Sequence, residues 1–339
     1  MPHRVEWEES PLNKQKITNK RRMKSVSLVA ICILLMFSLA ACGKKKPSLF
    51  LDFLDEEGNY ELYGGYDLRE INLDELGIET PGGVCVYNGN IYVCDISNNC
   101  IVKVRKDLKK EAIYGTLGME EGNFSEPWDI TFSGGCFYVL DNGNYCVQKF
   151  DSDFQYLDTY YLEPLHSERS GNYLSIAVDA EGTIYVSTDA PDTEDAYIYC
   201  WKNGTWKKEA GKIVGYLCTG DGNIYFANLF EFRKEKKETI IQSGENILYS
   251  FKNGKLTPLA EICFGYAPTA LTYWNDCFYM ISAGYGMVHC FSQQEENLDT
   301  LLVLPKASQH MYMDIDEAGN MYITDVENKC FYVAEKQEG

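Results

Sequence analysis

One short sequence motif, called the repeat word below, recurs six times along the chain and constrains the fold more strongly than any other feature. The word is a turn residue, a variable residue, an apolar residue, a tyrosine and a second apolar residue; its tyrosines are Tyr92, Tyr138, Tyr185, Tyr225, Tyr279 and Tyr322. Consecutive tyrosines lie 46, 47, 40, 54 and 43 residues apart. Such a period, filled with short strands, is typical of a β-propeller blade with four strands. The spacing therefore predicts six blades.

Each copy of the word reads as a tight turn followed by a strand. A glycine stands at the turn in five copies, where it permits positive φ, and Asp276 takes its place in the remaining copy. The apolar residues on both sides of the tyrosine predict a strand buried on both faces. Three residues after each tyrosine comes a short polar side chain that can bond its own turn backbone: Asp95, Asp141, Thr188, Asn228, Ser282 or Asp325.

The repeat resembles that of the NHL-repeat propellers, which runs approximately Pro-x-Gly-Ile-Ala-Val-Asp, then Gly-Asn-Ile-Tyr-Val-Ala-Asp, then Asp-x-x-Asn-x-Arg-Ile. The first copy follows this pattern through Pro81, Gly89 to Asp95, Asn98 and Ile101. The usual arginine is replaced by Cys100, Cys146 and Cys330 in the three copies that keep the turn pattern. The resemblance spans residues 82–334 and implies an all-β, six-bladed propeller of four-stranded antiparallel blades, but it implies no particular function.

The last blade needs a strand from elsewhere, because the chain ends just after Phe331 to Ala334, the third strand of that blade. We expect Asp67–Leu76 to supply its outer strand, so that the N-terminal end closes the ring and no sheet edge is left open. Gly58-Asn59-Tyr60 imitates the repeat word but precedes Tyr92 by only 32 residues. Seven blades therefore remain an alternative to six.

The N-terminal part reads as an export signal. Lys20, Arg21, Arg22 and Lys24 precede an apolar run from Val26 to Leu39, and small residues follow it. Leu39-Ala40-Ala41-Cys42-Gly43 resembles a bacterial lipobox, which implies that Cys42 carries a diacylglyceryl group. Residues 1–41 would then be a signal peptide, with Met23 as an alternative start of translation, and residues 42–48 a lipidated tether. A retained helix is the alternative, since the apolar run just reaches the length of a membrane span.

The charge balance argues against nucleic acid as a partner. The chain carries 31 Lys and Arg against 50 Asp and Glu, and removal of residues 1–41 leaves 24 against 47, a net charge of −23. Phosphate binding requires an excess of basic side chains. We therefore expect residues 49–339 to form an acidic propeller on the outer face of a bacterial cytoplasmic membrane, as a monomer.

Thirteen cysteines in an exported chain raise the question of disulfides. Most of them stand at equivalent positions of different blades, which lie far apart around a ring, so we expect small buried side chains. Cys94 and Cys100 are the exception, because a hairpin through residues 95–99 would place them opposite one another. They are the predicted disulfide pair.

Histidine is scarce, with four in the whole chain, and no metal-binding spacing is present. We therefore expect no metal and no cofactor apart from the lipid on Cys42. Propellers related to this family do include lactonases and lyases that hold calcium or zinc in the central channel. A metal-dependent lactonase or lyase is thus the first alternative, and a channel plugged by Tyr and Cys side chains would count against it.

The candidate ligand site is inferred from the position of residues in the repeat and not from a motif. The innermost strands of a propeller line its channel, and the residues that begin these strands form its mouth. An aromatic and acidic mouth would suit a sugar, a peptide or a cation, although packing between blades would equally explain the aromatic residues. The candidates for ligand binding are Trp128, Asp129, Tyr216, Tyr266, His310, Tyr312 and Asp314.

Blade four departs from the repeat by a long polar insert between Asn228 and Ile247. Long loops on a rigid scaffold often carry binding, and a solvated hairpin is the alternative. Its candidate contact residues are Arg233, Lys234, Lys236 and Lys237. The sequence thus predicts a non-catalytic platform for a protein, peptide or glycan at the cell surface; besides the enzyme, a structural subunit of an envelope complex remains an alternative.

Overall fold

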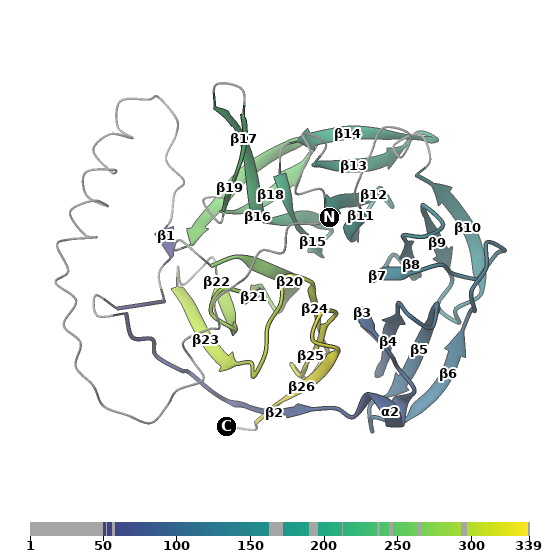
Figure 1. Ribbon diagram of the computed structural model, residues 1–339, viewed down its shortest axis with the longest axis horizontal. Coiled ribbons are helices and arrows are strands. Elements are labelled where there is room, and N and C mark those ends of the chain that lie inside the picture. Colours follow the sequence, from purple (N-terminus) through teal and green to yellow (C-terminus); the bar gives the residue numbers. More distant parts are fainter. Residues whose placement is uncertain are drawn as a thin grey trace. The chain divides into compact units, whose positions relative to one another are not determined.

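The computed structural model describes residues 50–337, apart from residues 52, 56–57, 163–171, 190–195, 212, 236–237, 244–246, 263–265 and 293–296. These residues form six sheets arranged around a common centre, and each sheet contains the four strands of one blade (Figure 1). The sheet of blade 4 has two further strands, β1 (Phe50–Leu51) and β17 (Glu238–Ser243). The prediction of an all-β, six-bladed propeller is confirmed. Within the described part, no helix is long and apolar enough to cross a membrane.

The inner strands of blades 1 to 6 line the channel: β3 (Pro81–Tyr87), β7 (Pro127–Ser133), β11 (Asn172–Val178), β15 (Ile213–Gly220), β20 (Pro268–Trp274) and β24 (Met311–Ile315). The second strands follow them through tight turns: β4 (Asn90–Asp95), β8 (Cys136–Asp141), β12 (Ile184–Asp189), β16 (Asn223–Glu235), β21 (Cys277–Ser282) and β25 (Met321–Asp325). All six repeat tyrosines lie in these second strands.

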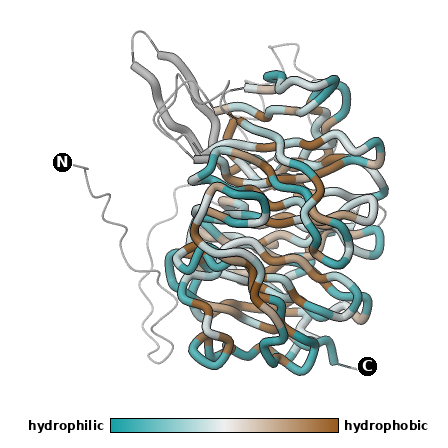
Figure 2. The backbone as a smooth tube through the Cα atoms, turned by 90° about the vertical axis from the view of Figure 1, so that its right-hand side faces the viewer, coloured by the Kyte–Doolittle hydropathy of each residue, from teal (hydrophilic) through white to brown (hydrophobic). Residues whose placement is uncertain are grey.

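Two further layers complete the blades. The third strands are β5 (Cys100–Arg105), β9 (Cys146–Phe150), β13 (Tyr197–Lys202), β18 (Ile247–Lys252), β22 (Met287–Ser292) and β26 (Cys330–Lys336). The outer strands are β6 (Lys110–Tyr114), β10 (Tyr156–Tyr161), β14 (Thr205–Gly211), β19 (Lys255–Ile262), β23 (Asn297–Val303) and β2 (Tyr66–Glu70). Hydrophobic residues run within the strands and hydrophilic ones gather at the turns (Figure 2), because each sheet packs its faces against the neighbouring blades.

The ring closes in blade 6, where β2 pairs antiparallel with β26. The predicted closing segment Asp67–Leu76 is correct for its first part and wrong for the rest, because residues Leu73–Leu76 form the short helix α2 instead of a strand. The Asn72 side chain accepts the Asp74 N–H at 3.1 Å and so begins the helix. Gly77 ends it with φ at 65°.

The three aspartates among the polar residues that follow the repeat tyrosines, Asp95, Asp141 and Asp325, bond their own turns and also fix the loop that leads into the same blade. The Asn98 side-chain amide donates to Asp95 Oδ2 at 2.7 Å. The backbone N–H groups of Glu79 and Thr80 donate to the same carboxylate at 2.9 and 3.1 Å. Asp141 repeats the arrangement with Ser125 N and the Asn144 side chain, both at 2.8 Å. One carboxylate therefore joins two loops of each such blade.

The predicted disulfide between Cys94 and Cys100 is wrong. Both thiols are free and buried. The register of β4 and β5 pairs Cys94 with Ile101 and Asp95 with Cys100. Because neighbouring residues of a strand point to opposite faces, Cys94 packs toward blade 2 with Phe137 and Val139, whereas Cys100 lies in the cluster on the other face. The equivalent pairing of Asp141 with Cys146 repeats this register in blade 2.

Candidate functional site: the central channel

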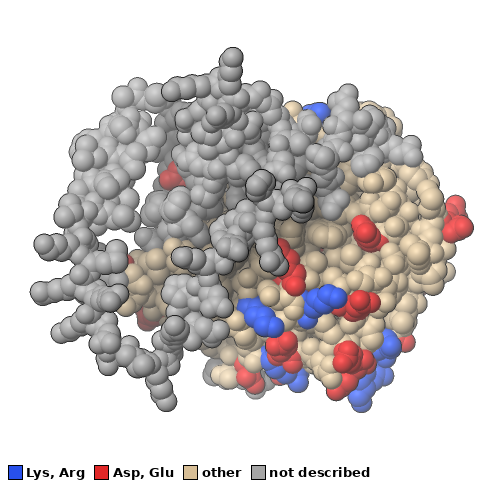
Figure 3. All heavy atoms as spheres, in the orientation of Figure 1, with Lys and Arg blue, Asp and Glu red and all other residues tan. Residues whose placement is uncertain are grey.

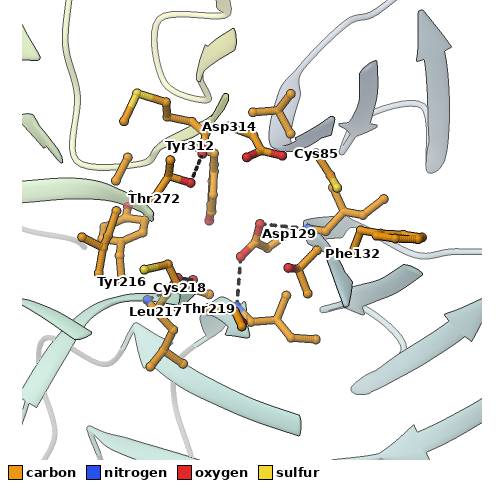
Figure 4. Close-up of a pocket in the computed structure, with 18 of the residues that line it drawn as sticks. Cys85, Asp129, Phe132, Tyr216, Leu217, Cys218, Thr219, Thr272, Tyr312 and Asp314 are labelled. Carbon is orange, nitrogen blue, oxygen red and sulfur yellow. Dashed lines mark hydrogen bonds between the residues drawn. The ribbon is translucent and has the colours of Figure 1, made fainter. Parts of the chain in front are cut away.

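A cavity of about 230 Å³ lies in the channel, lined by the inner strands of all six blades. Its polar groups come from two carboxyl groups, two thiols and several hydroxyls (Figure 4). They belong to Asp129, Asp314, Cys85, Cys218, Thr131, Ser175, Thr219 and Thr272. Neither Lys, Arg nor His is among the lining residues.

Tyr216 and Tyr312 cross the channel at the end where the inner strands begin, which we call the loop face. The Tyr312 hydroxyl of blade 6 donates to the Leu174 carbonyl oxygen of blade 3 at 2.7 Å. The Tyr216 hydroxyl of blade 4 donates to the Gln309 carbonyl oxygen at 2.5 Å. The two rings meet edge to face, 5.8 Å apart. They narrow the channel on this side. The Tyr312 bond joins opposite blades, and the Tyr216 bond joins blade 4 to the loop that enters blade 6.

Asp129 connects two neighbouring blades from within the cavity. Its Oδ1 accepts the N–H of Ile130 at 2.8 Å, and its Oδ2 accepts the N–H of Ile176 in blade 3 at 2.9 Å. Burial nevertheless raises the pKa of Asp129 to about 7, since the amide bonds that favour the charged form compensate the loss of water only in part. The side chain is 6% exposed. A carboxyl group that titrates near neutral pH thus faces the cavity.

Asp314 repeats this connection between the last and the first blade. Its Oδ2 accepts the N–H of Val86 in blade 1 at 2.7 Å, and its Oδ1 accepts the N–H of Ile315 at 2.9 Å. Removal from water raises the pKa of Asp314 to about 6, again against the effect of these amides. Burial and the charge of Asp314 also raise the pKa of the Cys85 thiol. Cys85 is therefore a neutral neighbour of the carboxyl group.

The channel offers a poor set of ligands for a metal ion. Among the described residues, no three His, Cys, Asp or Glu side chains come together. Every carboxyl oxygen of Asp129 and Asp314 accepts a backbone N–H, and the thiols beside them hold their protons because of burial. These residues do not fit the calcium or zinc site that the family resemblance implies for lactonases and lyases.

Four of the seven predicted ligand-binding residues line the cavity: Asp129, Tyr216, Tyr312 and Asp314. Trp128 and His310 lie together outside it, with their rings edge to face at 5.8 Å. The His310 Nδ1 is 2.9 Å from Glu327 Oε1. Their role in binding a ligand stays a prediction.

Tyr266 lies between blades 4 and 5 and not at the channel. Its hydroxyl is 2.9 Å from His289 Nδ1, and its ring packs on Phe53. Burial lowers the pKa of His289 to about 3, so that this histidine is neutral at physiological pH. The aromatic residues of the predicted mouth had a second explanation, namely packing between blades. That explanation is the correct one for Tyr266.

The sequence did not identify Cys85, Cys218 and Thr272 as channel residues. The alternation of residues along the inner strands does not predict which side chains face the channel. In blades 1 to 5 the pairing of the first two strands shifts register near the start of the inner strand. A β-bulge reverses the faces of the residues that follow it. Trp128 and Tyr312 each lie ten residues before a repeat tyrosine, so the sequence predicts that both face the channel. The register shift between Pro127 and Asp129 turns Trp128 to the other face of its strand. Blade 6 has no such shift.

The insert of blade 4 extends β16 and adds β17 (Glu238–Ser243), which pairs with it antiparallel beyond the blade. The insert is thus a β-hairpin, and its role in binding a partner stays a prediction. Arg233 and Lys234 lie in β16, whereas Lys236 and Lys237 lie outside the described residues. On the face shown in Figure 3, acidic and basic side chains of the described residues are interspersed.

Fold and channel together define the class of this protein: it is a six-bladed β-propeller. The family model of the NHL repeat matches residues 124–150, which include β7 and β8 of blade 2. No curated protein matches the chain.

Solved structures with the same fold are very different in sequence. Virginiamycin B lyase from Staphylococcus aureus has a TM-score of 0.52 at 12% identity, covering 79% of this chain and 99% of its own. A gluconolactonase from Xanthomonas campestris has a TM-score of 0.55 at 12% identity, covering 79% and 89%. The WD40 repeats of RRP9 have a TM-score of 0.51 at 11% identity, covering 79% and 97%. Identities this low establish the fold alone.

Proposed function

We propose that the protein is an exported lipoprotein, anchored through Cys42, whose propeller is a non-catalytic platform that binds a ligand at the cell surface. One observation supports the binding role above all: both channel carboxyl groups are bonded through each oxygen to backbone amides. Such groups hold the blades in place and give the cavity its acidic character. They are poorly placed to coordinate a metal or to move during a reaction.

The cavity favours a small ligand that is neutral or positively charged. It measures about 230 Å³ and carries two carboxyl groups without a basic side chain. A cation in the cavity would be attracted by Asp129 and Asp314 and would lower their raised pKa values. Peptide amines and amino sugars are ligands of this class. The proposal for a larger protein partner requires a surface outside the channel.

A second candidate, a lyase or lactonase, is favoured by the pKa of Asp129, because a carboxyl group that titrates near 7 is suited to general base catalysis. The solved structures of a lyase and a gluconolactonase with this fold are consistent with it. Hydrolysis of δ-gluconolactone with calcium, zinc or magnesium present tests the candidate. We expect the unmodified chain and the Asp129→Asn variant to hydrolyse the lactone at the same rate. Faster hydrolysis by the unmodified chain would favour the enzyme.

Binding in the channel is tested by filling it. Thr272→Trp places an indole in the cavity, and Thr205→Trp, at the exposed start of β14, is its control. Amines and amino sugars are screened by the thermal shift that they cause in the full chain. We expect a stabilising ligand whose shift disappears in Thr272→Trp only; a shift that survives this change would place binding elsewhere.

The anchor is tested separately by Cys42→Ala in cells. We expect the unmodified chain to fractionate with membranes and to be heavier than its residues 42–339 by the mass of the lipid. Loss of both properties in Cys42→Ala supports the lipoprotein. A variant that stays in the membrane with an unchanged mass would contradict it and would favour a retained helix.

A further inference from the structure

The chain that precedes the first blade lies on the outer rim of the propeller. We call the described residues from 50 to 63 the strap. At its start, β1 pairs in parallel with β19 at the outer edge of blade 4. Further along, Leu62 bridges Thr300 in the outer strand of blade 5, and the Tyr63 N–H donates to the Thr300 carbonyl oxygen at 2.9 Å. The strap therefore follows the rim of blades 4 and 5 before the chain enters β2 (Figure 1).

Buried side chains fix the first part of the strap to the propeller. Leu51 and Phe53 are only 3% and 8% exposed. The Phe53 ring packs on His289 of blade 5, with 4.4 Å between the ring centroids. A turn follows, and its two ends are joined by an antiparallel bridge between Leu54 and Tyr60. Because of this bridge, Tyr60 lies close to β1.

The second part of the strap exposes three large apolar side chains within four consecutive residues. Tyr60, Leu62 and Tyr63 are 36%, 53% and 61% exposed. Glu61, which stands between them in the sequence, is exposed as well. Among the described residues, the other large hydrophobic side chains with such exposure lie in blades 1 and 2 and in the loop between them. Exposed apolar side chains that lie together mark an interaction surface.

The length of chain before the strap indicates what this surface meets. Phe50 follows Cys42 by eight residues, and eight residues span at most about 28 Å. A compact domain of the size of the propeller measures about 50 Å across. When Cys42 carries the lipid of the proposed function, the strap therefore stays near the bilayer. The opposite rim, formed by blades 1 and 2, lies farther from it.

The residue types of the strap fit the surface of a bilayer. Tyrosine is enriched at the membrane–water interface, because its ring is apolar and its hydroxyl stays in water. The lipid anchor also holds the strap beside the bilayer at a high effective concentration, so that a small apolar surface suffices for contact. We propose that the strap is a second membrane contact, which places Tyr60, Leu62 and Tyr63 on the lipid head groups and turns the rim of blades 4 and 5 toward the bilayer. This inference rests on the proposed anchor at Cys42.

The contact is tested with the lipidated chain, purified from cells and reconstituted in phosphatidylcholine vesicles. Tyr63→Trp adds an indole to the strap, and the matched control Tyr161→Trp adds one to β10 of blade 2, where the tyrosine is 55% exposed. The fluorescence of the unmodified chain is subtracted from that of both variants. In vesicles of phosphatidylcholine brominated close to the head group, we expect the added indole of Tyr63→Trp to be quenched by at least half. That of Tyr161→Trp should lose less than a tenth.

Equal quenching in the two variants would overturn the inference, and so would a Tyr63→Trp indole that the brominated lipid does not quench. Sedimentation of the lipidated chain in detergent, where no bilayer is present, tests a second copy as the partner. We expect a monomer; a dimer that Leu62→Ser dissociates would assign the strap to self-association instead.

Mass spectrometry of the vesicle sample separates this inference from the proposed anchor. A chain without the mass of the lipid contradicts the anchor and the membrane contact together. A lipidated chain whose strap is not quenched contradicts the membrane contact alone and leaves the anchor standing.

Discussion

Asp129 and Asp314 hold their protons more tightly in the folded protein than an exposed carboxyl group does. Their pKa values are about 7 and 6, against an ordinary value of 3.8, because the channel removes them from water. Between pH 4 and pH 7 the native state therefore binds more protons than the unfolded state. Because stability falls with rising pH wherever the native state binds more protons, these groups reduce the free energy of unfolding over this range.

Asp129→Asn should flatten this pH dependence. The amide imitates the protonated carboxyl group and does not titrate, so the variant should lose less stability than the unmodified chain between pH 5 and pH 8. The difference should be on the order of 1 kcal/mol per pH unit below pH 7. Urea unfolding at several pH values measures it, with the exposed Asp153→Asn as control. Identical slopes in Asp129→Asn and the unmodified chain would contradict the raised pKa.

The cysteines should differ in reactivity according to burial. Cys94 and Cys218 are buried, and burial raises the pKa of both thiols, so thiolate is scarce and reagents cannot reach it. Cys136, Cys277 and Cys290 are partly exposed, but burial raises the pKa of the Cys290 thiol. Alkylation of the native chain at pH 7.5, followed by mass spectrometry, should therefore modify Cys136 and Cys277 first among the cysteines that the structure describes. Recovery of a Cys94–Cys100 disulfide from protein purified under air would contradict the register of blade 1.

At the scale of elements, the second strands were predictable because each one is hydrophobic on both faces and follows a recognisable turn. The inner strands were harder to predict. The repeat pattern showed that they exist, but it did not show which of their side chains face the channel. Trp128 illustrates the reason, since the bulge at the start of β7 turns it away from the cavity that Asp129 enters. Bulges depend on packing between blades, which a pattern within one strand does not contain.

The closing strand β2 should contribute strongly to stability. A chain that begins at residue 71 leaves the edge of β26 unpaired and removes the Leu68 side chain from the cluster of blades 5 and 6. We expect a loss of several kcal/mol, since a domain has only about 5–15 kcal/mol in total. Thermal unfolding measures it. A peptide of residues 64–72 should restore stability by pairing with β26, and a truncated chain as stable as the intact one would contradict the closure.

For the whole molecule, the hydrogen bonds across the channel connect parts that are distant around the ring. Tyr312→Phe removes the bond from blade 6 to Leu174 in blade 3 and leaves a buried carbonyl oxygen without its partner. This should cost about 1–2 kcal/mol of unfolding free energy. Tyr161→Phe, at a residue that is 55% exposed, is the control and should change stability by less than about 0.5 kcal/mol. Equal effects in chemical denaturation would contradict a structural role for the Tyr312 hydroxyl.

The fold as a whole was predictable because six copies repeat the same signal, so that errors in one copy are corrected by the others. The site was predictable in part. The repeat placed Asp129 and Asp314 on inner strands, but only the packing of the blades brings them to one cavity with Cys85 and Cys218.

The pairing of β2 with β26 also sets the order in which the molecule can be completed. Arg69 bonds Glu335, and Gln337 N donates to the Gly65 carbonyl oxygen at 2.8 Å, so an early strand and a late strand of the propeller are partners. A ribosome or a translocation channel delivers β2 before all six inner strands and delivers β26 after them. Until then the ring stays open, Asp314 has not yet reached blade 1, and the channel is exposed to water. The growing chain thus carries an unfinished edge for almost its whole synthesis, which makes the last blade the step at which a chaperone would be most useful.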